Sequence, residues 1–314
     1  MLVNILFVMA SIVFLYLGAE TLVRGSSSLA LRLGLTPMVV GLTVVAIGTS
    51  CPELVVSVKA SLKGISDIAL GNVIGSNICN IALILGLSAL ARPIHINGTV
   101  VKRDIPIMIG ISIIFVLFLL DGTVSRLEAL SLFLGMVSYI WINIIIGRKE
   151  AVPIQPGLEE LVQKPVKKPW IDFVFVITGL IMLPLGAELL VKGAIGIATK
   201  IGLSEAVIGL TIVALGTSLP ELATTTVASI KKEGDIGVGN VLGSNISNIL
   251  LIIGVAALLA PIHAVDISFV DVAVMMGLAV IVWPFARTGF VLSRKEGALL
   301  LIIYCGYIYY LIPK

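Results

Sequence analysis

The fold is decided by Gly48-Thr49-Ser50-Cys51-Pro52-Glu53, which recurs 168 positions later as Gly216-Thr217-Ser218-Leu219-Pro220-Glu221. Each copy lies inside an apolar run long enough to cross a lipid bilayer. A carboxylate is costly at that depth, so Glu53 and Glu221 are candidates for functional residues. Carboxylates at equivalent positions of a duplicated membrane chain predict one shared cation site between the two halves.

The composition is typical of an integral membrane protein. Of the 314 residues, 58% are hydrophobic and only 12% are charged, and the mean hydropathy is +1.15. Soluble domains carry about 25% charged residues, so we predict an all-α integral membrane protein. The net charge of +3 is small and spread over loops, which gives no reason to expect a nucleic-acid partner. No obligate protein partner is evident either.

Ten apolar segments can be distinguished along the chain. They lie near residues 2–23, 36–62, 68–91, 104–121, 125–146, 170–192, 204–230, 236–260, 266–286 and 293–312. Residues 18–95 align with 186–263 without a gap, and roughly half of the aligned residues are identical. The sequence therefore predicts a first transmembrane repeat over 1–146, a linker over 147–169 and a second transmembrane repeat over 170–314.

The membrane topology follows from the number of helices in each repeat. Five is odd, so tandem copies enter the membrane from opposite sides and form an inverted repeat. Most of the 21 lysines and arginines fall in loops on one side when the N-terminus is placed outside. We therefore expect a multi-pass protein of the cell (plasma) membrane, with both termini extracellular. The Pro-containing linker 147–169 would be a cytoplasmic tether, too short for its own core.

The residue types around Glu53 suit a hard cation. Thr49 and Glu53 are four positions apart and share one face of a helix. Pro52 lacks an N–H and its ring clashes with the carbonyl of Gly48, so we expect the helix to bend and to leave carbonyl groups near Ala46 to Gly48 without helical partners. Hydroxyl, carboxylate and carbonyl oxygens are ligands that suit Na⁺ and Ca²⁺. Residues 216–221 repeat the arrangement.

The second duplicated motif is Gly71-Asn72-Val73-Ile74-Gly75-Ser76-Asn77-Ile78-Cys79-Asn80, repeated over 239–248. Each copy holds a serine and an asparagine on one helix face: Ser76 and Asn80, and Ser244 and Asn248. We expect the helices of both motifs to meet at the centre, with Glu53 facing Glu221. Two such carboxylates would not both stay ionised alone. One Ca²⁺ or several Na⁺ would neutralise them, and mutually exclusive occupancy is the basis of exchange.

Other polar residues have simpler interpretations. Glu20 and Glu188 precede Arg24 and Lys192 by four positions, which predicts ion pairs within a helix rather than a transport role. The cysteines lack metal-ligand or disulfide spacing and are expected to be small buried thiols: Cys51, Cys79 and Cys305. An enzyme is disfavoured, because neither histidine falls within the predicted membrane core, where it could serve as a base.

At these two motifs the sequence resembles the cation/calcium exchanger superfamily, and in particular its prokaryotic sodium/calcium exchanger branch. The resemblance covers nearly the whole chain and implies a ten-helix antiporter that exchanges Ca²⁺ for Na⁺ and has no cofactor. It also implies that Glu53 and Glu221 ligate both ions and that Thr49 and Thr217 contribute mainly backbone oxygen. The flanking Na⁺ ligands implied by it are Ser50, Ser218, Ser76, Ser244 and the carbonyls of Ala46 and Ala214, and Asn80 and Asn248 would complete the centre.

The counter-ion has alternatives at this point. A buried glutamate can carry a proton, so Ca²⁺/H⁺ antiport is possible within the same fold, although the hydroxyl-rich motifs favour Na⁺. Some relatives, notably those that also move K⁺, carry Asp at the position of Asn80 or Asn248, so the two asparagines weaken the case for K⁺-dependent exchange. A passive cation channel is a weaker alternative, because proline-broken helices around two glutamates suit an occluding site.

Overall fold

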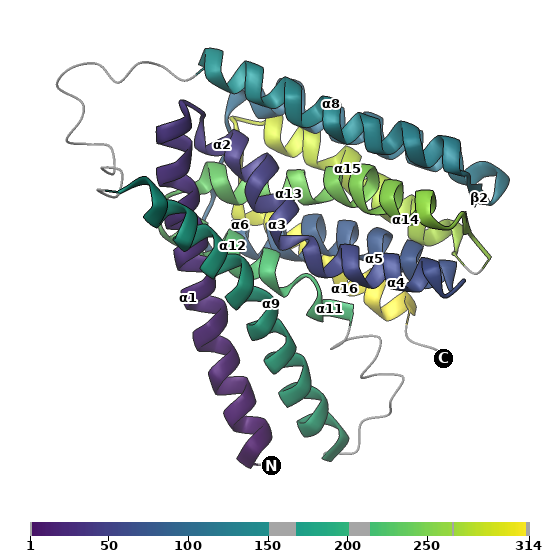
Figure 1. The fold of residues 1–314 in the computed structure, drawn as a ribbon, viewed down its shortest axis with the longest axis horizontal. Helices are drawn as coiled ribbons and strands as arrows, with labels where there is room; N and C mark the ends of the chain where they lie inside the picture. The colour runs from purple at the N-terminus through teal and green to yellow at the C-terminus, as the bar shows by residue number, and fades with distance from the viewer. Residues whose placement is uncertain (1, 151–167, 201–213, 266, 312–314) are drawn as a thin grey trace.

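The computed structural model describes residues 2–150, 168–200, 214–265 and 267–311, which are almost entirely helical (Figure 1). The first half contains α1 (Leu2–Leu33), α2 (Pro37–Val40), η1 (Gly41–Val45), α3 (Ala46–Thr49), α4 (Cys51–Leu62), α5 (Ser66–Ile78), η2 (Cys79–Leu85), α6 (Gly86–Ala91), β1 (Ile94–His95), η3 (Val100–Asp104), α7 (Ile105–Phe118), η4 (Leu119–Asp121), β2 (Thr123–Val124) and α8 (Arg126–Glu150).

The second half has a closely similar series. It contains α9 (Pro169–Lys200), α11 (Ala214–Gly216), α12 (Leu219–Ile230), α13 (Gly234–Ser247), η6 (Asn248–Ile253), α14 (Gly254–Leu259), β3 (Ile262–His263), α15 (Phe269–Arg287), β4 (Val291–Leu292) and α16 (Arg294–Leu311). The predominance of helix agrees with the predicted fold class.

Several of the described helices can span a membrane. Seven are long and apolar enough, or eight when the bent pair Pro37–Thr49 and Cys51–Leu62 counts as one span. The chain is therefore a mostly helical, multi-pass membrane protein. The remaining two of the ten predicted segments are not seen as spans. The segment 204–230 begins in 201–213, outside the described residues, and the tenth corresponds to α16, which carries three charged residues in its first turn.

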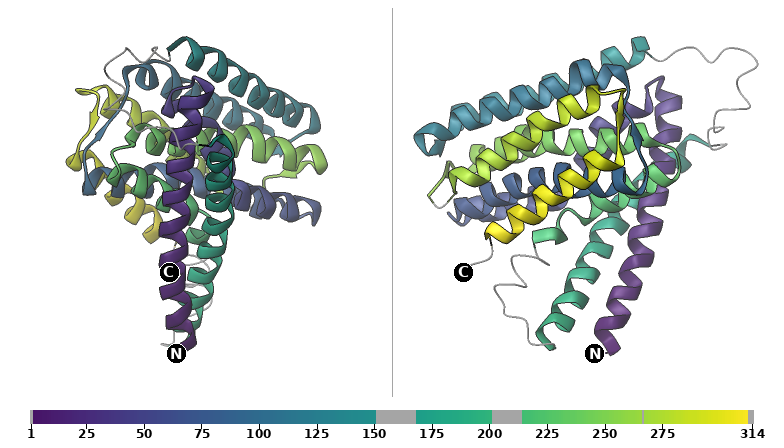
Figure 2. Two further views of the ribbon diagram at one scale, coloured as in Figure 1. Left: turned by 60° about the vertical axis from the view of Figure 1, so that its left-hand side comes forward. Right: turned by 180° about the vertical axis from the view of Figure 1, so that it is seen from behind.

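α1 and α9 lie side by side and cross the other helices steeply (Figures 1 and 2). Glycines allow the close approach. A Cβ added to Gly179 would lie 2.6 Å from the Cβ of Leu22, and one added to Gly18 would lie 3.0 Å from the Cβ of Met182. Small residues at a crossing let membrane helices associate through van der Waals contact, since lipid provides no hydrophobic drive between helices.

The centre of the molecule is formed by two helical rods, α5–η2–α6 and α13–η6–α14. Their most apolar 18-residue windows are 78% and 83% buried, against 17% in α1. Helices that are apolar on every side are expected where protein surrounds them completely. The rods are therefore where polar side chains can be shielded from lipid.

Local structure recurs at the spacing of the sequence repeat. The π-helical segments η2 and η6 occupy nearly equivalent positions, and the backbone is left-handed at both Gly64 and Lys232, which are 168 residues apart. β1 pairs antiparallel with β4, and β2 pairs antiparallel with β3. β1 is equivalent to β3 and β2 to β4, so the two strand pairs are equivalent. Each joins a loop of one half to a loop of the other.

The helix breaks next to the first motif proline, as predicted. α3 ends at Thr49, α4 begins at Cys51, and the two segments are bent by 47°. The carbonyl of Ala46, however, has partners, contrary to our expectation. The Ser50 N–H donates to it at 3.0 Å and the Thr49 hydroxyl at 3.3 Å. The break lies far enough along the chain for the last helical bond to Ala46 to form.

Two predictions about other side chains are wrong. Glu20 forms its ion pair with Lys231 at the end of α12, at 2.6 Å, rather than with Arg24 in its own helix. The reason is that α1 packs against α12, which brings the lysine within reach. The ion pair of Glu188 with Lys192 is confirmed. Among the cysteines only one is buried, Cys79, whereas Cys51 and Cys305 are exposed.

Candidate cation site

The two duplicated motifs converge on the rods at the centre of the molecule. Nine of the predicted ligands are residues that are at most 4% exposed: Thr49, Ser50, Glu53, Ser76, Asn80, Ser218, Glu221, Ser244 and Asn248. The helix breaks before α4 and α12 bring the first motif to this point, and the turns where α5 meets η2 and α13 meets η6 bring the second. A polar cluster therefore lies within the apolar core.

Side chains from the two halves touch within this cluster. The Ser50 hydroxyl donates to Oε1 of Glu221 at 3.2 Å, and the Ser218 hydroxyl donates to Oγ of Ser76 at 3.4 Å. The carboxylates of Glu53 and Glu221 are close enough to repel each other electrostatically. The structure thus brings together one glutamate from each half.

Two asparagines that sequence reasoning did not single out hold these glutamates in place. The Asn72 amide donates to the backbone carbonyl of Glu53 at 3.1 Å and to the Ser57 hydroxyl at 2.9 Å. The equivalent Asn240 amide donates to the backbone carbonyl of Glu221 at 3.4 Å and to the Thr225 hydroxyl at 3.1 Å. Asn240 also accepts a hydrogen bond from the Thr49 hydroxyl. The sequence contained one signal for these two asparagines, because they occupy the same position in the two copies of the motif.

A second pair of overlooked asparagines orients the predicted amide ligands. Asn80 donates to Oδ1 of Asn245 at 3.0 Å, and Asn248 donates to Oδ1 of Asn77 at 2.9 Å. Each bond joins the two halves, and each maps onto the other at the repeat spacing. The amide nitrogens of Asn80 and Asn248 are therefore engaged, which leaves their oxygens available to a ligand.

Four buried carboxylate and amide oxygens of the cluster have no hydrogen-bond donor among the described residues. They are Oε2 of Glu53, Oε2 of Glu221, Oδ1 of Asn80 and Oδ1 of Asn248. A buried acceptor left unpaired costs about 1–3 kcal/mol, and a charged one costs more. Carboxylate and amide oxygens are ligands for hard cations such as Ca²⁺. The donor set therefore fits a cation as the substrate of the site.

The charge balance points the same way. In the part of the chain that the structure describes, no ion pair includes Glu53 or Glu221. Within that same part, no group of three or more His, Cys, Asp or Glu side chains could hold a metal ion. Hydroxyl, amide and carboxylate oxygens predominate instead, which favours alkali or alkaline-earth cations over transition metals.

The other three predicted ligands are outside this group of nine. Thr217 is partly exposed, and its side chain lies beside Glu53. Ala46 is fully buried, with the hydrogen-bonded carbonyl described above. Ala214 begins α11, directly after residues 201–213, which lie outside the described part of the chain.

The chain matches a known family model. The model described as sodium/calcium exchanger protein covers residues 3–145 and 171–312, which is most of both halves. Among curated proteins, the putative antiporter CaxA of Alkalimonas amylolytica is 39% identical over 317 residues, 99% of each chain. The sodium/calcium exchanger MaX1 of Methanosarcina acetivorans is 33% identical over 98% of this chain and 97% of its own length.

A solved structure is also similar. The sodium-calcium exchanger NCX_Mj, soaked with zero Na⁺ and Ca²⁺, has a TM-score of 0.86 and 33% sequence identity, with 98% of this chain and 99% of that chain covered. The matches extend over both duplicated motifs, and they agree with the cluster of buried oxygens. The chain therefore belongs to the sodium/calcium exchanger family, membrane transporters that carry out cation/Ca²⁺ antiport without a cofactor and are not enzymes.

Proposed function

We propose that this chain is a secondary-active antiporter that exchanges Na⁺ for Ca²⁺ by alternating access at the central acidic site. The observation that carries this proposal is the set of unpaired carboxylate and amide oxygens around two glutamates, neither of which has a lysine or arginine partner among the described residues. One Ca²⁺ neutralises both carboxylates, and several Na⁺ do the same. Since the two kinds of ion compete for Glu53 and Glu221, binding of one releases the other.

The remaining ligands divide between the ions by their chemistry. Glu53 and Glu221 serve both ions, and Asn80 and Asn248 complete the centre. The hydroxyls and backbone oxygens suit Na⁺ in flanking positions: Thr49, Thr217, Ser50, Ser218, Ser76, Ser244 and the carbonyls of Ala46 and Ala214. A proton site would not need such a shell, which is why we favour Na⁺ over H⁺ as the counter-ion.

The proposed topology makes the two access states of the site structurally equivalent. Ten spans form two inverted repeats, over 1–146 and 170–314, joined by the linker 147–169 on the cytoplasmic side of the plasma membrane. Both termini are then extracellular. Because the halves have opposite orientations, the same local arrangement can open the site first to one side and then to the other.

Purified protein in liposomes tests the counter-ion. We expect Ca²⁺ uptake into Na⁺-loaded vesicles, driven by the Na⁺ gradient, to persist when an ionophore collapses the pH gradient. Uptake that disappears with the pH gradient would instead identify Ca²⁺/H⁺ antiport. An added requirement for K⁺ would identify K⁺-dependent exchange, and Ca²⁺ flux without any counter-ion gradient would identify a channel. Vesicles containing the Glu53→Gln variant supply the background.

A further inference from the structure

One ion pair fastens α1 to the opposite half of the molecule. Glu20, in α1, pairs with Lys231 at 2.6 Å, and Lys231 is the C-cap residue directly after α12. Both side chains are only about 30% exposed. The contact therefore joins one of the two steeply crossing helices to the helix that carries Glu221.

The repeat supplies an equivalent pair that is not formed. Glu188 in α9 is equivalent to Glu20, and Lys63, the C-cap residue after α4, is equivalent to Lys231. Both residues are conserved between the two copies. Glu188 instead pairs with Lys192 in its own helix, with both side chains about 60% exposed. Among the described residues, Lys63 makes no ion pair.

Helix packing shows the same asymmetry. α1 packs along α12, whereas the equivalent helices α9 and α4 make little or no contact. The ion pair thus forms where α1 lies against α12, and the equivalent pair is absent where α9 does not lie against α4. An exposed pair within one helix, such as Glu188 with Lys192, is weak and can readily be exchanged for another partner.

We propose that Glu20–Lys231 and Glu188–Lys63 are two alternating latches, one of which closes each side of the transporter in turn. The inference rests on the proposed alternating access. When α1 and α9 shift and α12 is released, Glu20 separates from Lys231. α9 then lies against α4 as α1 does now, and Glu188 leaves Lys192 to pair with Lys63. On the proposed topology, the structure has the cytoplasmic latch closed.

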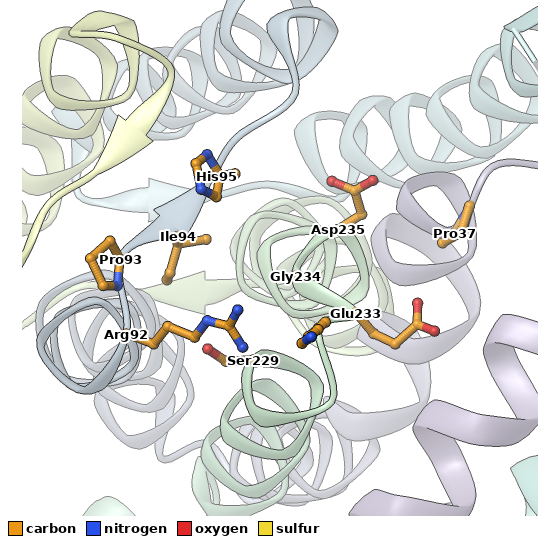
Figure 3. Close-up of a pocket in the computed structure, with 10 residues that line it drawn as sticks. Pro37, Arg92, Pro93, Ile94, His95, Ser229, Glu233, Gly234 and Asp235 are labelled. Carbon is orange, nitrogen blue, oxygen red and sulfur yellow. The ribbon is translucent and has the colours of Figure 1, made fainter. Parts of the chain in front are cut away.

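A further contact strengthens only the latch that is closed here. The Ser27 hydroxyl donates to Glu233 at 3.2 Å, in the turn that follows Lys231. This turn also lines a cavity of about 270 Å³ (Figure 3). The equivalents of Ser27 and Glu233 are Ile195 and Ile65, which cannot form that bond. The two latches are therefore unequal, and the resting protein should favour the state with Glu20 engaged.

Cross-linking tests the latches directly. The background carries Cys51→Leu and Cys79→Ser, which copy the equivalent residues of the second repeat, and Cys305→Ser. With a short bis-methanethiosulfonate reagent, which links two thiols through disulfides, we expect the Glu20→Cys/Lys231→Cys pair to cross-link in the resting protein. The Glu188→Cys/Lys63→Cys pair should cross-link only under ionic conditions that favour the other state. Either cross-link should stop exchange, and reduction should restore it.

Cross-linking is measured as a change in the mobility of the protein on a gel, so this measurement does not depend on which ions the protein carries. A chain that moves no Ca²⁺ against Na⁺ would refute the proposed function, yet its cross-links could still be followed with Na⁺, Ca²⁺ or neither. Conversely, a Glu188→Cys/Lys63→Cys variant that exchanges Ca²⁺ but never cross-links under any of these conditions would overturn the latch.

Charge substitutions provide a second test. Glu20→Gln, placed in the Glu188→Cys/Lys63→Cys background, should raise the cross-linked fraction about two- to fivefold, the effect of losing one partly exposed ion pair. The control in the same background is Lys232→Gln, which removes a positive charge one residue away from Lys231. It should leave the cross-linked fraction unchanged.

Charge reversal tests the latch without cysteines. Glu188→Lys or Lys63→Glu alone should slow exchange, and the double variant should restore it, because the pair is re-formed with its charges reversed. Losses that simply add in the double variant would show that the two residues do not pair during transport.

Discussion

At the scale of single residues, the orientation of the central amides is the feature with the clearest consequence. Asn80 and Asn248 each donate to an asparagine of the opposite half, so neither amide can turn without losing that bond. Their oxygens remain without a donor within the described part of the chain. An oxygen held in this way needs no reorganisation when an ion arrives, which favours binding.

Neutralising either central glutamate should abolish Ca²⁺ transport. Glu53→Gln and Glu221→Gln each keep the size of the side chain and remove one of the two charges that balance Ca²⁺. We expect Ca²⁺ uptake by liposomes to fall to background in both variants, while the amount of membrane-inserted protein stays normal. Glu128→Gln, at the exposed start of α8, is the matched control and should transport normally. Near-normal exchange in either central variant would refute the assignment of these ligands.

Asn248→Asp should change both ion preference and stability. A third carboxylate favours more bound positive charge, so the cation preference or the pH dependence of exchange should shift. The substitution also removes the amide donor to Asn77 and leaves two acceptors facing each other, which should cost about 1–3 kcal/mol of unfolding free energy. Competition among Na⁺, Ca²⁺ and K⁺ measures the first effect, and thermal unfolding in detergent measures the second. An unchanged selectivity and pH profile would exclude Asn248 as a ligand.

Glu233 should make stability depend on pH. Burial in the turn between α12 and α13 raises the pKa of this carboxyl above its ordinary value, and the nearby charge of Asp235 raises it further. The folded state then holds the proton more tightly than the unfolded state, so stability falls as pH rises through the raised pKa. Glu233→Gln should remove this loss, as measured by melting temperature between acidic and neutral pH. A pH profile identical to that of the unsubstituted protein would contradict it.

At the scale of helices and turns, the sequence was informative where a residue type acts on its own backbone. Pro52 predicted the break before α4, because proline removes a donor wherever it occurs. The π-helical turns of η2 and η6 have no such marker, since they depend on how the rods pack. The sequence likewise did not show the roles of Asn72 and Asn240, because each depends on a backbone carbonyl of another helix that only the folded structure places within reach. Glu20 was misassigned for the same reason, since its partner Lys231 is 211 residues away.

The crossing of α1 and α9 depends on the absence of a side chain at Gly179. A Cβ there would lie 2.6 Å from the Cβ of Leu22 and 2.7 Å from the carbonyl oxygen of Gly18, so the helices must move apart. We expect Gly179→Ala to lower the unfolding free energy by about 1–3 kcal/mol, the usual cost of overpacking. Gly110→Ala, in α7 with open space around it, is the control and should be neutral. Equal melting temperatures for the two variants would argue against tight packing at this crossing.

At the scale of the whole molecule, the two halves correspond closely, which supports the proposed inverted arrangement in the membrane. Hydrogen bonds, strand pairs and left-handed turns all recur 168 residues apart, although the latches do not. The sequence predicted this duplication because it is visible as identity between aligned residues. It did not reveal which half is engaged by its crossing helix, since Glu20 and Lys231 are identical to their equivalents Glu188 and Lys63.

Equivalent turns should be accessible from opposite sides of the membrane. Lys63 and Lys232 lie in turns that follow α4 and α12. In a chain without other cysteines, Lys63→Cys should react with a membrane-impermeant thiol reagent added outside intact cells. Lys232→Cys should react only when the membrane is opened. Labelling of both from the same side would contradict the inverted arrangement of the repeats.

The pairing of β1 with β4 and of β2 with β3 has a consequence for assembly of the chain. Each two-residue strand pair joins a segment of the first half to a segment that is translated later. The two central rods also pack against each other. Two polypeptides, translated separately from a gene divided between codons 157 and 158, should therefore find each other in the bilayer and reconstitute a working particle. The covalent link between the halves would then serve to bring both halves to the same place in the membrane, and the folded protein would not need it to stay together.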